Sequence, residues 1–340
     1  MSSTAESLQT TLASKNLAPG HQRFLIQMGR LLPCLAQSAA AKEPALTLYQ
    51  SSARQWLFYL QSLCRIYRDV QDKNPFKALS APIKALEDQL GAVDYWDSWL
   101  KDAAAQKDFP DVLHTALEQH KADELSKLQT LLDSDEWLLA DFTRIRTMME
   151  ELAEVDWHKA TKDRRKVAEF IAAELEKLED DYDAGEFDFE ELELGVHEFR
   201  RKLRWLSIYA QSLEGLIQLR PAERIDAALQ PYMTKAVVES RYNVVPAAAA
   251  GIEPLYFSAP RFYALSWVIA EIGTIKDDGL KIETLTNLAT DSGLSANAVA
   301  PFLRDCTHTL ATIPATVAKI ARTFIEENAI LRGLRADILR

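Results

Sequence analysis

The chain has 340 residues, of which 48% are hydrophobic and 26% are charged, and its net charge is −11. This composition excludes a disordered or low-complexity protein and is sufficient for one large or two ordinary domains. The negative charge alone would argue against a polyanionic partner, because phosphate binding relies on a positive field. Eleven acids, however, fall between Glu174 and Glu193 beside the single base Lys177, so the acidity is local.

Targeting and redox features favour a cytoplasmic protein. The segment Met1 to Lys15 is polar and does not resemble a secretory signal. The longest apolar run, Phe262 to Ala270, is far shorter than the roughly 20 residues that a membrane-spanning helix needs. The three cysteines, Cys34, Cys64 and Cys306, are odd in number and widely spaced, which argues against a disulfide framework. We expect no membrane association.

Apolar residues recur at spacings of three and four along most of the chain, which predicts amphipathic helices. Two stripes show the pattern best: Val167, Phe170, Ile171, Leu175 and Leu178, then Val196, Phe199, Leu203, Leu206, Ala210 and Leu213. The stretch Val244 to Pro260, rich in proline and alanine, indicates a connection. We find no convincing strand alternation, so the predicted fold class is all-α.

The sequence also shows a weak internal repeat. Phe58 to Leu63 recurs 150 positions later as Ile208 to Leu213, each near the end of a helical pattern. A hydrophobic-glycine step follows in both halves, at Leu90-Gly91 and at Ile272-Gly273. Two related halves are therefore expected.

Four basic residues give the clearest candidate site. His197, Arg200, Arg201 and Arg204 are spaced i, i+3, i+4 and i+7, which places them on one helical face. Guanidinium groups bind phosphate oxygens in a bidentate manner, so this face suits an extended chain of phosphates. The competing interpretation is a solvated face masked by the acidic segment 174–193.

The segment Val196 to Trp205 resembles the signature helix of the conserved histidine α-helical domain (CHAD) family, in which an apolar residue and a histidine precede arginine and further bases. The hydrophobic-glycine steps resemble the second family element, in which an aspartate follows four residues after glycine. Asp277 fits that element, whereas the first half has Tyr95. The chain is thus similar to a divergent and unusually acidic family member.

The resemblance implies two antiparallel, four-helix-type bundles related by a pseudo-repeat, with inorganic polyphosphate bound in a basic cleft between them. We assign residues 1–150 to the first bundle and 151–340 to the second. The 150-residue offset matches the four basic positions to Thr47, Gln50, Ser51 and Arg54. Only Arg54 keeps a base there, so we include it as an opposing contact.

A helix-turn-helix within 285–303 is the weaker, DNA-binding alternative. Gly293 would end its first helix and Ser295 would cap the second. Residues Ser295 to Leu303 contain no lysine or arginine, and Pro301 lies inside them. Nucleic acid is therefore not the expected partner.

A metal enzyme is a further alternative, because helical bundles hold metals through carboxylate-x-x-His pairs. Asp111/His114 and Asp305/His308 have this spacing, but two such pairs are unremarkable for this composition. We find no phosphate loop, nucleophile elbow or HExxH helix. We predict a non-catalytic polyanion-binding module without metal or cofactor, and a helical scaffold for a protein partner is the alternative.

Overall fold

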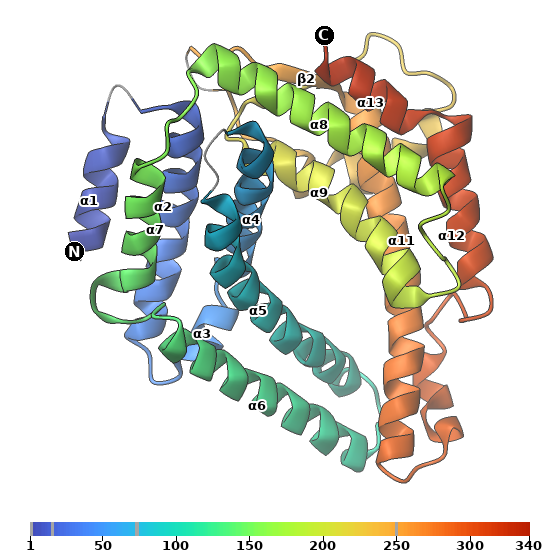
Figure 1. Ribbon diagram of the computed structural model, residues 1–340. Coiled ribbons are helices and arrows are strands. Elements are labelled where there is room, and N and C mark those ends of the chain that lie inside the picture. Colours follow the sequence, from blue (N-terminus) through green and yellow to red (C-terminus); the bar gives the residue numbers. More distant parts are fainter. Residues whose placement is uncertain (1–2, 15–16, 72–74, 249–250) are drawn as a thin grey trace. The chain divides into compact units, whose positions relative to one another are not determined.

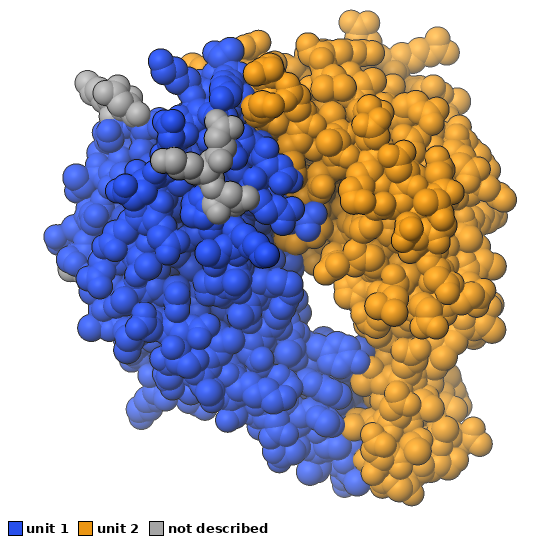
Figure 2. Space-filling model, viewed as in Figure 1, with its two compact units in different colours: residues 1–163 blue, residues 164–340 orange. Residues whose placement is uncertain are grey.

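The computed structural model describes residues 3–14, 17–71, 75–248 and 251–340 (Figure 1). The fold is all-α, as the apolar spacing predicted, apart from one sheet of two short strands. Two compact units are formed, residues 1–163 and residues 164–340, which Figure 2 colours separately. No helix of the described residues is long and apolar enough to cross a membrane.

The first unit contains helices α1 to α7. Their bounds are α1 Ser3–Leu12, α2 Pro19–Ala39, α3 Pro44–Tyr49, α4 Ala53–Val70, α5 Phe76–Ala104, α6 Asp111–Ser134 and α7 Thr143–Ala153. Helix α4 packs against α2 and α5, and α5 packs against α6. An aromatic cluster fills the core, in which the ring of Trp157 lies 5.3 Å from Tyr67 and 5.7 Å from Phe76. Gly20 is required beside it, because a Cβ there would lie 2.6 Å from the Trp157 ring.

The first unit extends beyond the expected boundary at residue 150, which falls inside α7. Asp163, near the start of α8 (Ala160–Asp183), accepts hydrogen bonds from Arg23 at 2.7 Å and from Tyr67 at 2.8 Å. Because these bonds are buried, they tie the first turn of α8 to α2 and α4. The division therefore comes after Asp163.

The second unit is organised around a long helix, α11 (Ala259–Asp291). Its other main helices are α9 Glu198–Ser212, α12 Ile313–Arg322 and α13 Ile330–Ile338, with a short α10 at Lys235–Val238. Helices α9, α12 and α13 all contact α11. Both predicted apolar stripes are buried, which confirms the helical periodicity from Val167 to Leu178 and from Val196 to Leu213.

The expectation of no strands was wrong in one place. Strands β1 (Ile217–Arg220) and β2 (Leu255–Ser258) pair in parallel, with Arg220 opposite Ser258. Each strand has four residues, too few for an alternating pattern to stand out from the sequence. Strand β2 lies within the predicted connection Val244 to Pro260, of which residues 249–250 lie outside the described part.

The predicted second helix of the helix-turn-helix is a 3₁₀ helix, Ala296–Leu303, and not an α-helix. Ser295 caps it, since its hydroxyl accepts from the Asn297 N–H at 3.3 Å, and Gly293 adopts a φ of 72°. Pro301 inside the segment is incompatible with a regular α-helix, because it lacks an N–H and clashes with the preceding turn. The segment packs against α11 through the buried Val299 and Phe302.

Candidate functional site

The basic helix α9 begins from a π-helical turn, Leu192–His197. Gly195 permits this turn, because a Cβ at that position would lie 1.7 Å from the carbonyl oxygen of Asp188. The backbone before the turn therefore lies directly against it, and Phe187 and Phe189 pack on Phe199 of α9 with ring centroids 5.0 and 5.5 Å away. This packing fixes the direction in which α9 leaves the turn.

The four candidate bases lie on one continuous helical stretch, with His197 at the end of the π-helical turn and the three arginines in α9. The Nδ1 atom of His197 lies 2.8 Å from Oε2 of Glu193, and this hydrogen bond lowers the pKa of Glu193. Arg201 is exposed and forms a salt bridge of 2.5 Å with Glu198. Arg204 is half-buried on the same helix. Internal acids thus pair with part of the face.

Arg200 is held by backbone groups instead of by a carboxylate. Its Nε donates to the carbonyl oxygen of Ile269 at 3.0 Å, and the guanidinium lies against Gly273, where a Cβ would be 2.9 Å from Nε. Burial lowers the pKa of Arg200, while the charge of Asp277 acts in the opposite direction. Arg200 forms no salt bridge with any residue of the described part.

Arg54, in the first unit, also packs against a glycine, but its other neighbours differ from those of Arg200. Its guanidinium lies against Gly91, where a Cβ would be 2.7 Å from an Nη atom. Nε forms a salt bridge of 2.9 Å with Glu87, and Nη1 forms one of 2.7 Å with Asp94. The charge of Arg54 is therefore compensated within its own unit.

The difference between the two arginines follows from the residues around each glycine. Four positions before the glycine, Glu87 supplies a carboxylate to Arg54, whereas Ile269 supplies only its backbone carbonyl to Arg200. Three positions after it, the first unit has Asp94 and the second has Lys276. Of these two arginines, Arg200 is therefore the one that forms no salt bridge in the described residues.

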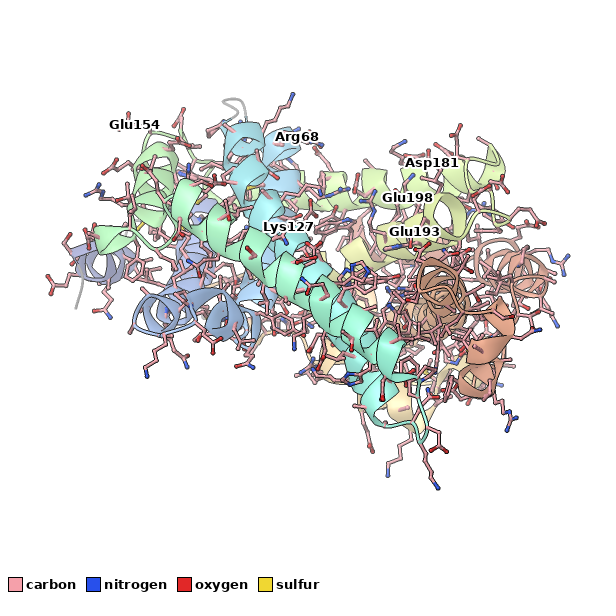
Figure 3. The ribbon with its side chains drawn as sticks, turned by 90° about the horizontal axis from the view of Figure 1, so that it is seen from below. Arg68, Lys127, Glu154, Asp181, Glu193 and Glu198 are labelled. Atoms are coloured by element: carbon pink, nitrogen blue, oxygen red, sulfur yellow. The ribbon has the colours of Figure 1, made fainter. Side chains whose placement is uncertain are left out.

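Five acids of the segment 174–193 have described side-chain partners, and only one of these partners belongs to the candidate basic face. Figure 3 labels Asp181, Glu193 and Glu198 among the side chains of this region. Asp181 pairs with Lys202 at 2.8 Å, and Glu193 pairs with His197. Other acids of the segment bind elsewhere: Glu174 accepts from Tyr209, Glu176 pairs with Arg335 and Glu179 pairs with Arg332. Masking of the basic face by this segment is thus limited to Glu193 among the pairs described.

One cation near the site was missed in the sequence. Lys276 of α11 is only 14% exposed, pairs with Asp277 at 2.7 Å and contributes to the electrostatic stabilisation of Glu193. Its position three residues after Gly273 was the available signal, because residues at i and i+3 share a helical face. Lys276 therefore adds a cation near Glu193, the partner of His197, and Asp277 pairs with it.

The carboxylate-histidine pairs considered for metal binding have other partners. His308 Nδ1 lies 2.8 Å from Asp278, and Asp305 pairs with Lys281 at 2.8 Å. His114 lies 3.6 Å from Glu118. Within the described residues, no group of three or more His, Cys, Asp or Glu side chains is arranged to hold a metal ion.

Comparison with protein-family models, with curated proteins and with solved structures finds no match for this chain.

Proposed function

We propose that this chain is a non-catalytic polyanion-binding module and that its ligand is inorganic polyphosphate. The contacts are His197, Arg200, Arg201 and Arg204, while Arg54 is a secondary contact because two carboxylates already neutralise it. Polyphosphate is proposed over other polyanions because Val196 to Trp205 resembles the signature helix of the CHAD family, whose ligand is polyphosphate. No metal or organic cofactor enters the proposal.

The state of Arg200 is the observation that carries the proposal. A partly buried guanidinium without a carboxylate partner retains Nη donors for a ligand, and arginine stays charged even when burial lowers its pKa. Its Nε bond and its seat on Gly273 hold it in place before binding. A preorganised cation loses less conformational freedom when an anion binds.

The internal ion pairs of the basic face do not prevent this function. Side chains of Arg201 and Glu193 are more than half exposed, and exposed pairs contribute at most about 1 kcal/mol. A chain of phosphates presents many charges at once and releases counterions when several bases bind it. Such a ligand can therefore replace Glu198 and Glu193 at low energetic cost.

Calorimetric titration with long-chain polyphosphate tests the proposal. The intact protein and the triple variant His197→Ala, Arg200→Ala, Arg204→Ala are titrated at low and at physiological salt. We expect salt-sensitive binding that the variant loses, because the contacts are electrostatic. Absence of heat at both salts, checked by an independent equilibrium-binding assay, would reject the proposal.

A protein-scaffold role is the second candidate, and Leu194 is the observation that favours it. This leucine is 77% exposed in the turn that leads into α9. Burial of this side chain by a partner would remove apolar surface from water and favour the complex. If Leu194 serves a partner, Leu194→Ser weakens that interaction and leaves polyphosphate binding unchanged.

A further inference from the structure

A second basic pocket lies in the unit of residues 164–340, where strands β1 and β2 end and helix α11 begins. Both strands run in parallel and finish at the paired residues Arg220 and Ser258, and α11 starts at the next residue, Ala259. Ligands commonly bind beyond the carboxyl ends of parallel strands, and helix N-termini favour anions. An excess of positive charge at this location would therefore favour an anionic ligand.

Positive charge exceeds negative charge in this pocket, although the whole chain is acidic. The pocket has a volume of about 200 Å³, and its charged lining consists of Arg220, Arg261, Arg340 and a single acid, Asp337. An adjoining pocket of about 270 Å³ shares three of these four residues. That second pocket adds Arg164 and Glu253, which pair with each other at 3.6 Å and leave the excess unchanged.

Arg261 and Asp337 form the fixed floor of the pocket. Nη1 of Arg261 donates to both carboxylate oxygens of Asp337, at 2.9 and 3.0 Å. The Arg261 side chain crosses Gly333 of α13, where a Cβ would lie 2.4 Å from its Nε. Asp337 also accepts from the backbone N–H of Ser258 at 3.0 Å, so a carboxylate already occupies the first donor of the α11 N-terminus.

Arg220 and Arg340 remain available for a ligand. Arg220 is exposed, stacks over the Tyr256 ring at 4.3 Å and forms no salt bridge within the described ranges. Arg340 approaches Asp337 only at 4.0 Å and is 74% exposed. The hydroxyl of Ser258 makes no side-chain hydrogen bond in the described part of the chain. These groups surround a space in which the Asp337 carboxylate already accepts hydrogen bonds from Arg261 and from the Ser258 N–H.

We propose that this pocket binds the phosphate group of a small phosphorylated molecule. Arg220 and Arg340 contact the phosphate oxygens, the Ser258 hydroxyl donates a hydrogen bond, and the Arg261–Asp337 pair keeps the floor rigid. Guanidinium forks match phosphate geometry, and a volume of about 200 Å³ exceeds several times the roughly 30 Å³ share of one water. The site is separate from the α9 face and does not depend on polyphosphate binding.

Titration of the full chain at low salt with inorganic phosphate and with glycerol 3-phosphate tests this site, with acetate as a carboxylate control. We expect saturable binding of both phosphates, at least tenfold weaker in the double variant Arg220→Gln, Arg340→Gln. Because both side chains are exposed, the variant should keep its circular dichroism spectrum. Binding of inorganic phosphate alone would identify the free ion as the ligand and would overturn the assignment to a phosphorylated molecule.

The double variant Arg322→Gln, Arg332→Gln is the matched control, because both arginines are more than half exposed in the same unit, lie outside the pocket lining, and their replacement removes the same two charges. Equal weakening in this control, or no phosphate binding by the intact chain, would overturn the proposal. A variant with Arg201→Ala and Arg204→Ala must retain phosphate binding. Loss there would assign the phosphate to α9 instead.

Discussion

The guanidinium of Arg200 lies against the backbone of Gly273, where any side chain would displace it. This contact joins α9 to α11 at a base of the candidate site that forms no salt bridge in the described residues. The glycine thus controls the position of the cation without touching a ligand itself. Replacing Gly273 therefore moves the Arg200 side chain and leaves its charge unchanged.

Gly273→Ala should weaken polyphosphate binding about tenfold, which corresponds to about 1.4 kcal/mol. A Cβ would come within 2.9 Å of Nε, so the end of the Arg200 side chain must move while its charge remains. The free energy of unfolding should hardly fall, because alanine favours a helix over glycine by about 1 kcal/mol. Calorimetric titration and urea denaturation measure the two effects.

Gly91→Ala is the control, since it displaces Arg54 from an equivalent seat in the other unit. We expect unchanged polyphosphate affinity, because Glu87 and Asp94 already neutralise Arg54. If both glycine variants lose affinity equally, Arg54 is a primary contact and our ranking of the two arginines is incorrect.

Glu193→Gln should strengthen polyphosphate binding two- to fivefold. Glu193 is the acid of segment 174–193 that pairs with the basic face, and its removal frees His197 and reduces repulsion of the ligand. Affinity at low salt is the measurement. Glu190→Gln removes the same charge from the same segment, but the Glu190 side chain pairs with no base in the described residues. An equal gain in both variants would show a general charge effect and no masking.

The sequence predicted the local features of this fold well. The apolar stripe from Val196 to Leu213 is buried, because the 3.6-residue period depends only on neighbouring residues. The seat of Arg200 on Gly273 could not be predicted, since it joins two helices that a strand pair and a long connection separate. The same limit concealed the pocket at β1, β2 and α11, whose arginines are far apart in the chain.

The internal repeat illustrates a second limit. The 150-residue offset pairs Arg54 with Arg204, whereas the contacts with Gly91 and Gly273 pair Arg54 with Arg200. The two alignments differ by four residues, about one helical turn, so both bury the same face. Hydrophobic periodicity cannot distinguish them, and a tertiary contact can. Within α9, Arg200 and not Arg204 is the arginine that lies against a glycine as Arg54 does.

Asp163→Asn should lower the free energy of unfolding by about 3 to 5 kcal/mol. Arg23 and Asp163 are only 5% and 1% exposed, and removal of one partner leaves a buried charge without compensation. Tyr67→Phe should cost about 1 to 3 kcal/mol, because it removes hydrogen bonds and keeps the ring beside Trp157. Urea denaturation gives both values. An Asp163→Asn cost no greater than that of Tyr67→Phe would show that the ion pair adds nothing beyond a hydrogen bond.

Asp97 should make the stability of the first unit depend on acidity between about pH 4 and pH 2. Burial acts to raise its pKa, but hydrogen bonds from Lys101, Lys121 and Tyr49 outweigh burial and lower the pKa to about 2, from 3.8 in the unfolded chain. A lowered pKa contributes stability above the unfolded value, and this contribution disappears as the pH falls through the folded value. The contribution at neutral pH is about 2 kcal/mol.

Asp97→Asn should therefore be less stable than the natural chain at pH 7, and the difference should close between about pH 4 and pH 2. Urea midpoints measured at half-unit intervals of pH follow it. Asp88→Asn on the same helix is the control, because Asp88 and its partner Lys84 are both more than half exposed, and such a pair contributes little. A deficit of Asp97→Asn that stays constant down to pH 2 would mean that lost packing, and not the charge of Asp97, causes the destabilisation.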